Sequence, residues 1–327
     1  MNCKNCGSES IIKWGKVNGV PRYFCKSCKR KFADNGALPG MSTPIEHVAD
    51  AVHSHFEGMS LDAITRNIEQ EGNTVSDAAI FKWVDRFTDE AIHMTKDLHP
   101  EVGQIWVGDE TVLKIGGKNV WMFDIMDADT RFLLATRIAL TRTMHDTQAV
   151  MEDAKRRAGK SPKAVVTDKM KAYPDAIDMA FGGEAEHRQG GPFKKDDSNT
   201  NLIERLHGSL KGRTKVMRGL KDINSAMQFV DGWTIHYNYF RPHIGLKGKT
   251  PAEVSGLKLP CRNWGELISQ SRGRVAKARH EDVPLYQSPK VATPMRVLGE
   301  FATKGRVRIT KRRPRITPPM PSLGTMR

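Results

Sequence analysis

The sequence of 327 residues lacks any uninterrupted apolar run near the roughly 18 to 20 residues that a membrane helix needs. Its start, MNCKNCGSES, lacks an apolar stretch that could act as a signal peptide. Internal repeats, long low-complexity runs and the periods of collagen or coiled coils are also missing. A hydrophobic content of 39% is enough for one sizeable core with small appended domains. We therefore expect a soluble chain that is made and kept inside a cell.

The net charge of +15 is distributed unevenly along the chain. Residues 1–40 carry 8 basic and 2 acidic residues, a net +6, and residues 257–327 carry 16 and 4, a net +12. The remaining residues carry 28 and 31, a net −3. Basic ends around a near-neutral body favour a nucleic-acid partner, because each Lys or Arg on a phosphate releases condensed counterions. A generally basic protein without such a partner is the alternative.

Four of the five cysteines form two C-x2-C pairs near the start of the chain: Cys3, Cys6, Cys25 and Cys28. This spacing is typical of a structural Zn²⁺ site in which four thiolates hold a segment too short to bury a core. Disulfides are the alternative, and they need an oxidising compartment that a chain without a signal peptide does not reach. We therefore expect a zinc ribbon in residues 1–40.

Residues 41–98 show apolar positions at helical spacing in three segments, with Ser60 and Ser76 as helix caps. Three short helices fit a helix-turn-helix DNA-binding domain, whose last helix would place Lys82 and Arg86 near DNA. A helical unit that only packs on the next domain is the alternative. We expect the histidines of this region to be surface residues: His47, His53, His55 and His93.

From residue 99 to 256 the pattern changes to strands and then alternates. QIWVGDETVLKIG, NVWMFDIMD and RFLLATRIAL predict a three-stranded antiparallel meander with a turn at Gly116-Gly117. A helix and the short strand KAVVTD follow the meander. After them come a second helix, a strand near AEHR and a longer helix from about Ser198. We therefore expect one mixed α/β domain, fold class α/β.

Residues 257–327 hold eight of the 17 prolines among scattered Arg and Lys. This composition predicts an extended or partly ordered basic tail. The segment 295–310 could form a small hairpin.

Three carboxylates stand where the chain would bring them together. Asp109 ends the first strand, Asp168 ends the fourth, and Glu204 lies in the last helix. In a meander-first α/β fold the first and fourth strands are neighbours, so Asp109 and Asp168 would emerge side by side. Clustered carboxylates repel one another unless they bind cations, and oxygen ligands suit Mg²⁺ or Mn²⁺ for phosphoryl transfer. Ordinary strand-end and helix-surface acids are the alternative.

The phrases around these acids, WVGDET, VVTDKMKAY and NLIERLHGSLKGR, followed by YNYFRPH and TPAE, resemble insertion-sequence DDE transposases. The order of zinc ribbon, helix-turn-helix and catalytic domain is also similar, over most of residues 1–256. The resemblance implies an RNase H-like catalytic domain in residues 99–256, with Asp109, Asp168 and Glu204 as catalytic ligands of Mg²⁺ or Mn²⁺. It also implies DNA contacts by residues of the last helix and beyond: Asn201, Arg205, Lys211, Arg213 and Arg218.

Other acids and histidines near these positions are not expected to bind the metal. Glu110 should point to the opposite face from Asp109, and Asp124 is treated as a bystander. We expect His207 and His243 to lie on a helix surface or to take part in packing. For Arg241, a structural role and a functional role are equally compatible with the sequence.

The resemblance implies a metal-dependent transposase that cleaves DNA at transposon ends and transfers the strand into target DNA. The partners would be double-stranded DNA and further copies of the chain, without a membrane, in the prokaryotic cytoplasm at the nucleoid. The alternatives are a non-enzymatic DNA-binding regulator derived from a transposase, and an RNase H-like nuclease without strand transfer. The sequence does not reveal which transposon-end sequences are recognised, which target DNA is preferred, or whether transposition follows a cut-and-paste or a copying pathway.

Overall fold

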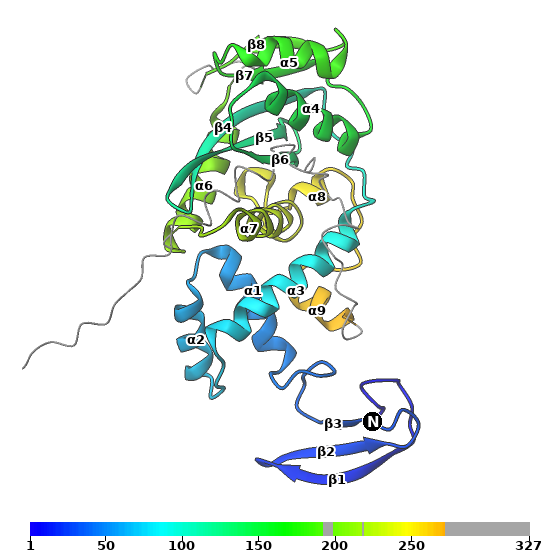
Figure 1. The fold of residues 1–327 in the computed structure, drawn as a ribbon. Helices are drawn as coiled ribbons and strands as arrows, with labels where there is room; N and C mark the ends of the chain where they lie inside the picture. Colours follow the sequence, from blue (N-terminus) through cyan, green and yellow to red (C-terminus); the bar gives the residue numbers. More distant parts are fainter. Residues whose placement is uncertain (192–198, 218, 272–327) are drawn as a thin grey trace, which may run out of the picture. The chain divides into compact units, whose positions relative to one another are not determined.

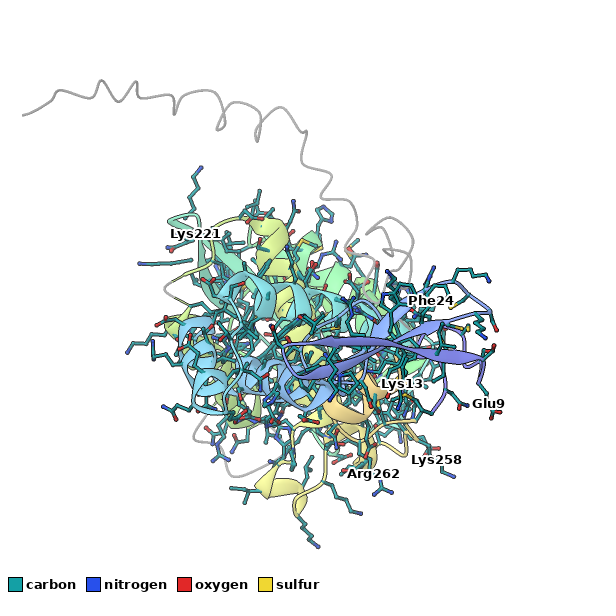
Figure 2. The ribbon with its side chains drawn as sticks, turned by 90° about the horizontal axis from the view of Figure 1, so that it is seen from below. Glu9, Lys13, Phe24, Lys221, Lys258 and Arg262 are labelled. Carbon is teal, nitrogen blue, oxygen red and sulfur yellow. The ribbon has the colours of Figure 1, made fainter. Side chains whose placement is uncertain are left out.

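The computed structural model describes residues 1–191, 199–217 and 219–271. The first 33 residues form a small antiparallel sheet of three strands (Figure 1): β1 (Ile11–Val17), β2 (Val20–Cys25) and β3 (Lys31–Ala33). Figure 2 shows Lys13 and Phe24 among the side chains of this sheet. Its core is only Cys3, Cys25 and Phe32, and Trp14 packs against Phe24 with ring centroids 5.3 Å apart. So small a core cannot hold a fold without additional support.

Three helices follow: α1 (Ile45–Glu57), α2 (Leu61–Gln70) and α3 (Asp77–Thr95). The caps that the sequence predicted are present, since Ser60 Oγ accepts from the Ala63 N–H and Ser76 Oγ accepts from the Ala79 N–H. The apolar faces of these helices pack on one another, and α3 also packs against α7 (Ile223–Ile235). The helix-turn-helix interpretation itself stays a prediction.

The central sheet has five strands in the spatial order β6-β5-β4-β7-β8. They are β4 (Ile105–Ile115), β5 (Lys118–Asp127), β6 (Leu133–Ala139), β7 (Ala164–Thr167) and β8 (Glu186–Gln189). The first three form the antiparallel meander, with positive φ at Gly116 and Gly117 in the tight turn. β7 adds parallel to β4, and β8 adds parallel to β7. The predicted adjacency of first and fourth strands is therefore confirmed.

Helices cover both faces of this sheet (Figure 1). α4 (Met144–Ala158) and α5 (Ala172–Phe181) lie on one face, and α6 (Asn201–Val216) and α7 lie on the other. Side chains of β4 alternate between the two layers: Trp106 meets Phe181 of α5, whereas Asp109 faces His207 of α6. A three-stranded meander, two further parallel strands and helices on both faces form the mixed α/β domain that the sequence predicted, in the RNase H-like arrangement that the family resemblance implied.

After α7 the chain runs through short elements: η1 (His236–Phe240), η2 (Ile244–Leu246), α8 (Pro251–Val254) and α9 (Trp264–Gln270). Residues 257–327 were predicted to be extended or partly ordered, and the start of this segment is ordered, because α9 packs on α1 through the stacked rings of Trp264 and Phe56, 5.4 Å apart. The rest of the tail, including the possible hairpin at 295–310, lies outside the described residues. Within the described ranges, no helix is both long and apolar enough to cross a membrane.

Candidate active site

Asp109 and Asp168 lie at the end of the β4–β7 pair. The last paired residues of the two strands are Val107 and Val166, and each aspartate follows two residues later. One ligand oxygen each from Asp109, Glu110 and Asp168 lies within 4.8 Å of the other two. A parallel pair therefore delivers two carboxylates to one edge of the sheet, as the sequence predicted.

Glu110 contributes an oxygen to this group from the opposite face of β4, as expected, because its partner Tyr173 belongs to α5 whereas Asp109 faces His207 of α6. The Glu110 carboxylate forms an ion pair with Arg142 and accepts a hydrogen bond of 2.6 Å from the Tyr173 hydroxyl. Burial, followed by the charges of Asp109 and Asp168, raises the pKa of Tyr173 well above 10, so the phenol keeps its proton. Because Arg142 compensates the charge of Glu110 and Tyr173 occupies one of its oxygens, Asp109 and Asp168 are the better candidates to hold a cation.

The Asp168 side chain is fixed by its own turn. Its Oδ1 accepts from the Met170 N–H at 2.9 Å, and the preceding Thr167 hydroxyl is 2.8 Å from His187 Nε2 in β8. Burial lowers the pKa of His187, and the nearby charge of Asp168 only partly opposes this shift. The carboxylate is therefore held at the strand end by a short turn after β7.

His207 of α6 lies between two aspartates of the sheet. Its Nδ1 is 3.3 Å from Asp109 Oδ2, and its Nε2 is 2.8 Å from Asp124 Oδ2. Burial lowers the pKa of His207, but its hydrogen bonds to Asp109 and Asp124 and their charges outweigh burial and raise it to about 9. The imidazolium therefore orients Asp109 and ties α6 to the sheet.

The sequence interpretation missed the roles of His207 and Asp124. Asp124 is buried and accepts a further hydrogen bond of 2.7 Å from Thr136. A signal was present, because a two-residue turn at Gly116-Gly117 pairs Ile115 with Lys118 and therefore sets Asp109 opposite Asp124. Both aspartates must then share the face that α6 covers.

Glu204 is exposed on α6, and it is not part of the group that Asp109, Glu110 and Asp168 form. Its Oε1 accepts a hydrogen bond of 2.9 Å from the hydroxyl of Thr200. The structure thus brings together two of the three predicted ligands, and α6, which carries the third, is joined to Asp109 through His207. The assignment of Glu204 as a ligand stays a prediction.

The residues predicted to contact DNA fall into different environments. Lys82, Arg205 and Lys211 are exposed, and Asn201 is half-buried at the start of α6. Arg86 forms hydrogen bonds within the chain, since it donates to Glu90 at 2.9 Å and to Ser271 at 2.8 Å. Arg218 lies outside the described residues.

Arg213 is a correction to the predicted set. It is 3% exposed and donates to the ring of His55 at 2.9 Å, so its guanidinium cannot reach a phosphate in this arrangement. The reason is helical spacing, which puts Arg213 on the buried face of α6 with Leu206 and Leu210. His55, expected on the surface, is buried with it.

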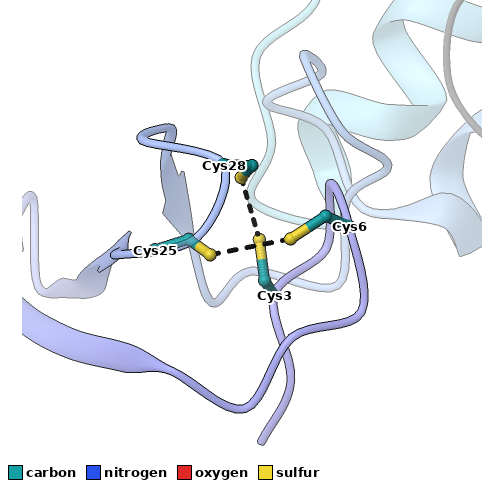
Figure 3. A group of neighbouring side chains, drawn as sticks. All are labelled: Cys3, Cys6, Cys25 and Cys28. Carbon is teal, nitrogen blue, oxygen red and sulfur yellow. Dashed lines mark hydrogen bonds between the residues drawn. The ribbon is translucent and has the colours of Figure 1, made fainter.

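The four N-terminal cysteines converge at one point (Figure 3). Their sulfurs lie within 4.8 Å of one another, with Cys3 Sγ to Cys28 Sγ and Cys6 Sγ to Cys25 Sγ both at 3.6 Å. Four sulfurs at about 2.3 Å from one tetrahedral ion would stand about 3.8 Å apart, whereas a disulfide needs about 2.05 Å. The arrangement is compatible with a four-cysteine metal site and not with disulfides.

The fold and this site define a class: an RNase H-like domain with paired carboxylates at the edge of its sheet. Residues 103–243 match a family model described as a DDE domain, and this range includes Asp109, Asp168 and Glu204. A transposase for the insertion sequence-like element IS431mec of Staphylococcus aureus is 22% identical over 201 residues, which cover 62% of this chain and 88% of that protein.

A protein in transposable element ISH50 of Halobacterium salinarum, itself uncharacterized, is 32% identical over 89 residues. That alignment covers 26% of this chain, which spans only 28% of the relative. The solved catalytic core domain of HTLV-2 integrase in complex with magnesium aligns with a TM-score of 0.37 and 17% identity, over 48% of this chain and 97% of that one. The chain is thus similar to a DDE domain over residues 103–243 and to an insertion-sequence transposase over 201 residues.

Proposed function

We propose that this chain cleaves DNA at transposon ends and joins the cut strand to target DNA in a metal-dependent reaction. The observation that carries the proposal is the meeting of Asp109 and Asp168 at one sheet edge inside the region that matches the DDE domain. Asp168 forms no ion pair within the described residues, and Asp109 shares the single positive charge of His207 with Asp124. A bound cation would therefore relieve the repulsion between the two carboxylates, which is about 4 kcal/mol at 4 Å and an effective dielectric near 20.

The donor set fits Mg²⁺ or Mn²⁺, which prefer carboxylate oxygens. Asp109 and Asp168 would hold the metal, and Glu204 would complete its ligands from α6. When bound, divalent ions supply Lewis-acid stabilisation of the charge that develops on a reacting phosphodiester.

The protein's own part in the reaction is positioning. His207 fixes the orientation of Asp109, and the turn at Met170 fixes that of Asp168. Glu110 holds Arg142 and Tyr173 beside the two ligands, which ties α5 to the strand end. Rigid carboxylates need little reorganisation as the reaction proceeds, which favours catalysis.

We further propose that the N-terminal modules bind DNA and that residues 1–40, 41–98, 99–256 and 257–327 act as separate units. The zinc ribbon would be held by Zn²⁺ on the four cysteines, and Lys82 on the exposed start of α3 would contact DNA. Two transposon ends must be joined in one complex, so the active form would be a dimer or larger oligomer in the prokaryotic cytoplasm.

The test is a cleavage assay with the full-length chain, Mg²⁺ and labelled duplexes from the genomic flanks of the gene. We expect nicked and joined products with Mg²⁺ and none with EDTA. Asp109→Asn should lower cleavage by about 100-fold or more while DNA binding persists. Asp175→Asn, on the exposed side of α5, is the matched control and should cleave normally.

Glu204→Gln tests the third ligand and should also abolish cleavage without loss of DNA binding. An unchanged cleavage rate in that variant would remove Glu204 from the site. Nicks without joined strands would indicate a nuclease, and salt-sensitive binding with neither product would indicate a regulator.

A further inference from the structure

A cavity of about 300 Å³ lies between α6 and the segment that follows η1. One wall is a single face of α6, formed by Leu202, Arg205 and Ser209. The opposite wall is Arg241–Gly245, and Arg131 from the turn before β6 closes the side. The site described above uses other residues of α6, so this cavity is a separate feature of the same helix.

The cavity carries three guanidinium groups and little opposing charge. Arg241 has its Nε 3.7 Å from Glu57 Oε1, a distance at which the pairing is weak. Arg131 and Arg205 form no ion pair with any carboxylate in the described part of the chain. Such an uncompensated cluster of Arg favours an anion, above all a phosphate that can accept paired N–H bonds.

Arg131 is held in place rather than left free in solvent. Its backbone has a φ of 59°, and its N–H donates to the Asp127 carbonyl at 3.0 Å. Asp127 in turn accepts from the N–H and the hydroxyl of Thr130, at 2.8 and 2.6 Å. The guanidinium lies against Gly245, where a Cβ would stand 2.1 Å from Arg131 Nη1. Glycine at 245 therefore lets the charged group lie flat against the wall.

Ile244 lies on the rim of the cavity with 99% of its surface exposed. It makes no contribution to the core, and it does not close the cavity. An apolar side chain at the edge of an Arg cluster is suited to a ligand that is anionic at one point and apolar beside it. A backbone phosphate and its neighbouring deoxyribose have this chemistry, and they continue beyond the cavity as a free nucleotide does not.

We propose that this cavity binds a backbone phosphate of double-stranded DNA through Arg131, Arg205 and Arg241, with Ile244 against the adjoining sugar. The inference rests on the proposed function, because it gives α6 a second task. One face of the helix places Glu204 and His207 on the side of the proposed active site. Another face would hold the DNA strand a short distance away. The contact is independent of base sequence, so it positions DNA without selecting it.

The test is fluorescence anisotropy of the full-length protein with a labelled random duplex over a range of salt concentrations. Arg131→Asn removes the charge and keeps a residue type that tolerates positive φ. We expect the slope of log K against log salt to fall by about 1, which corresponds to about an 8-fold loss of affinity at 0.1 M salt. Arg205→Gln should behave alike. Arg156→Gln is the matched control, since Arg156 is exposed on α4, on the other face of the sheet.

Two uncharged changes sharpen the test. Gly245→Ala should displace the Arg131 guanidinium and weaken binding several-fold, and Ile244→Ala should weaken binding about 3-fold without changing the salt slope. Circular dichroism melting confirms that each variant is folded. Wild-type affinity and slope in folded Arg131→Asn would overturn the proposal. A loss limited to binding of free dATP, measured by titration calorimetry, would also overturn it.

The DNA-binding test of the cavity can fail or succeed independently of the proposed transposase activity. If the wild type makes no nicks and Arg131→Asn still loses DNA affinity, the cavity stands and the transposase reaction fails. If the wild type nicks and joins DNA but Arg131→Asn binds normally, only the cavity proposal fails.

Discussion

The guanidinium of Arg213 is a buried positive charge that pairs with no carboxylate in the described part of the chain. Its Nε and Nη1 have no hydrogen-bond partner among the described residues, and its only polar contact is the neutral ring of His55. Burial lowers the pKa of Arg213 to about 10, so the group is still charged at neutral pH. A buried charge of this kind costs stability that an apolar side chain of similar length would not.

We therefore predict that Arg213→Met raises the free energy of unfolding by about 1 to 3 kcal/mol. Urea unfolding at pH 7 measures the change. Lys215→Met, exposed on the same turn of α6, is the control and should change stability by less than about 0.5 kcal/mol. A less stable Arg213→Met protein would show that the guanidinium has a partner that compensates its burial.

His55 makes stability depend on pH. Burial, then the charges of Arg213 and His236, lowers its pKa from 6.5 to about 3. Because the folded state resists the proton that the unfolded state accepts below pH 6.5, this contribution is present above pH 6.5 and is lost as the pH falls toward 3. Between pH 6.5 and pH 5 the loss from this residue should be about 2 kcal/mol.

The measurement is urea unfolding of wild type and His55→Gln at pH 7 and pH 5. The glutamine does not titrate and keeps an acceptor for Arg213, so the variant should lose about 2 kcal/mol less than wild type between the two pH values. Equal losses in the two proteins would assign the acid sensitivity to other groups.

At the scale of elements, the packing of α7 depends on close approach at Gly232. A Cβ at this position would stand 2.6 Å from Phe56 Cζ of α1 and 2.8 Å from Thr88 Oγ1 of α3. Both neighbours are buried, so neither can move without disturbing the interface. The contact between these three helices therefore depends on the absence of a side chain at 232.

Gly232→Ala should consequently lower the free energy of unfolding by about 1 to 3 kcal/mol, despite the better helix propensity of alanine. Gly208→Ala is the control, because Gly208 is exposed on α6 and a Cβ there would have nothing within 4 Å. It should raise stability by about 0.5 to 1 kcal/mol. Thermal melts of both variants beside wild type decide the matter, and a Gly232→Ala protein as stable as wild type would refute the packing argument.

Elements and their order were predictable because their signals are local. Gly116-Gly117 fixes a tight turn, Ser60 and Ser76 cap helices, and the short run KAVVT becomes β7. The adjacency of Asp109 and Asp168 followed from strand order alone. The fold class was confirmed on the same basis.

The sequence did not reveal which face of each helix is covered by the rest of the protein, and the roles of several residues depend on this. Arg213 was expected on the surface and is buried, because Leu206 and Leu210 turn that face of α6 toward the core. His207 was expected in packing or on a surface, and it lies between Asp109 and Asp124. These outcomes require tertiary contacts between segments about 80 or more residues apart, which local periodicity does not encode.

At the scale of the whole molecule, the N-terminal sheet and the remainder of the described chain have separate cores. The sheet buries Cys3, Cys25 and Phe32, whereas every other buried apolar cluster member belongs to one large core that begins at Leu38. Three strands with so small a core are not expected to be stable alone in water. We therefore propose that a metal ion on the four clustered sulfurs supplies the stability of residues 1–33, and Zn²⁺ fits this donor set.

Removal of one thiolate should accordingly unfold the sheet and spare the RNase H-like domain. We predict that Cys25→Ser binds less than about a tenth of the wild-type zinc, and that hydrogen exchange speeds up in β1–β3 while β4–β7 keep their protection. Cys261→Ser is the control, because Cys261 is buried against Met94, outside the sulfur cluster, and should keep one zinc per chain. Mass spectrometry under native conditions gives the zinc content, and a Cys25→Ser protein with a full equivalent of zinc would exclude the four-thiolate site. Since the two cores are separate, loss of the metal should weaken DNA affinity while leaving the geometry of Asp109 and Asp168 intact.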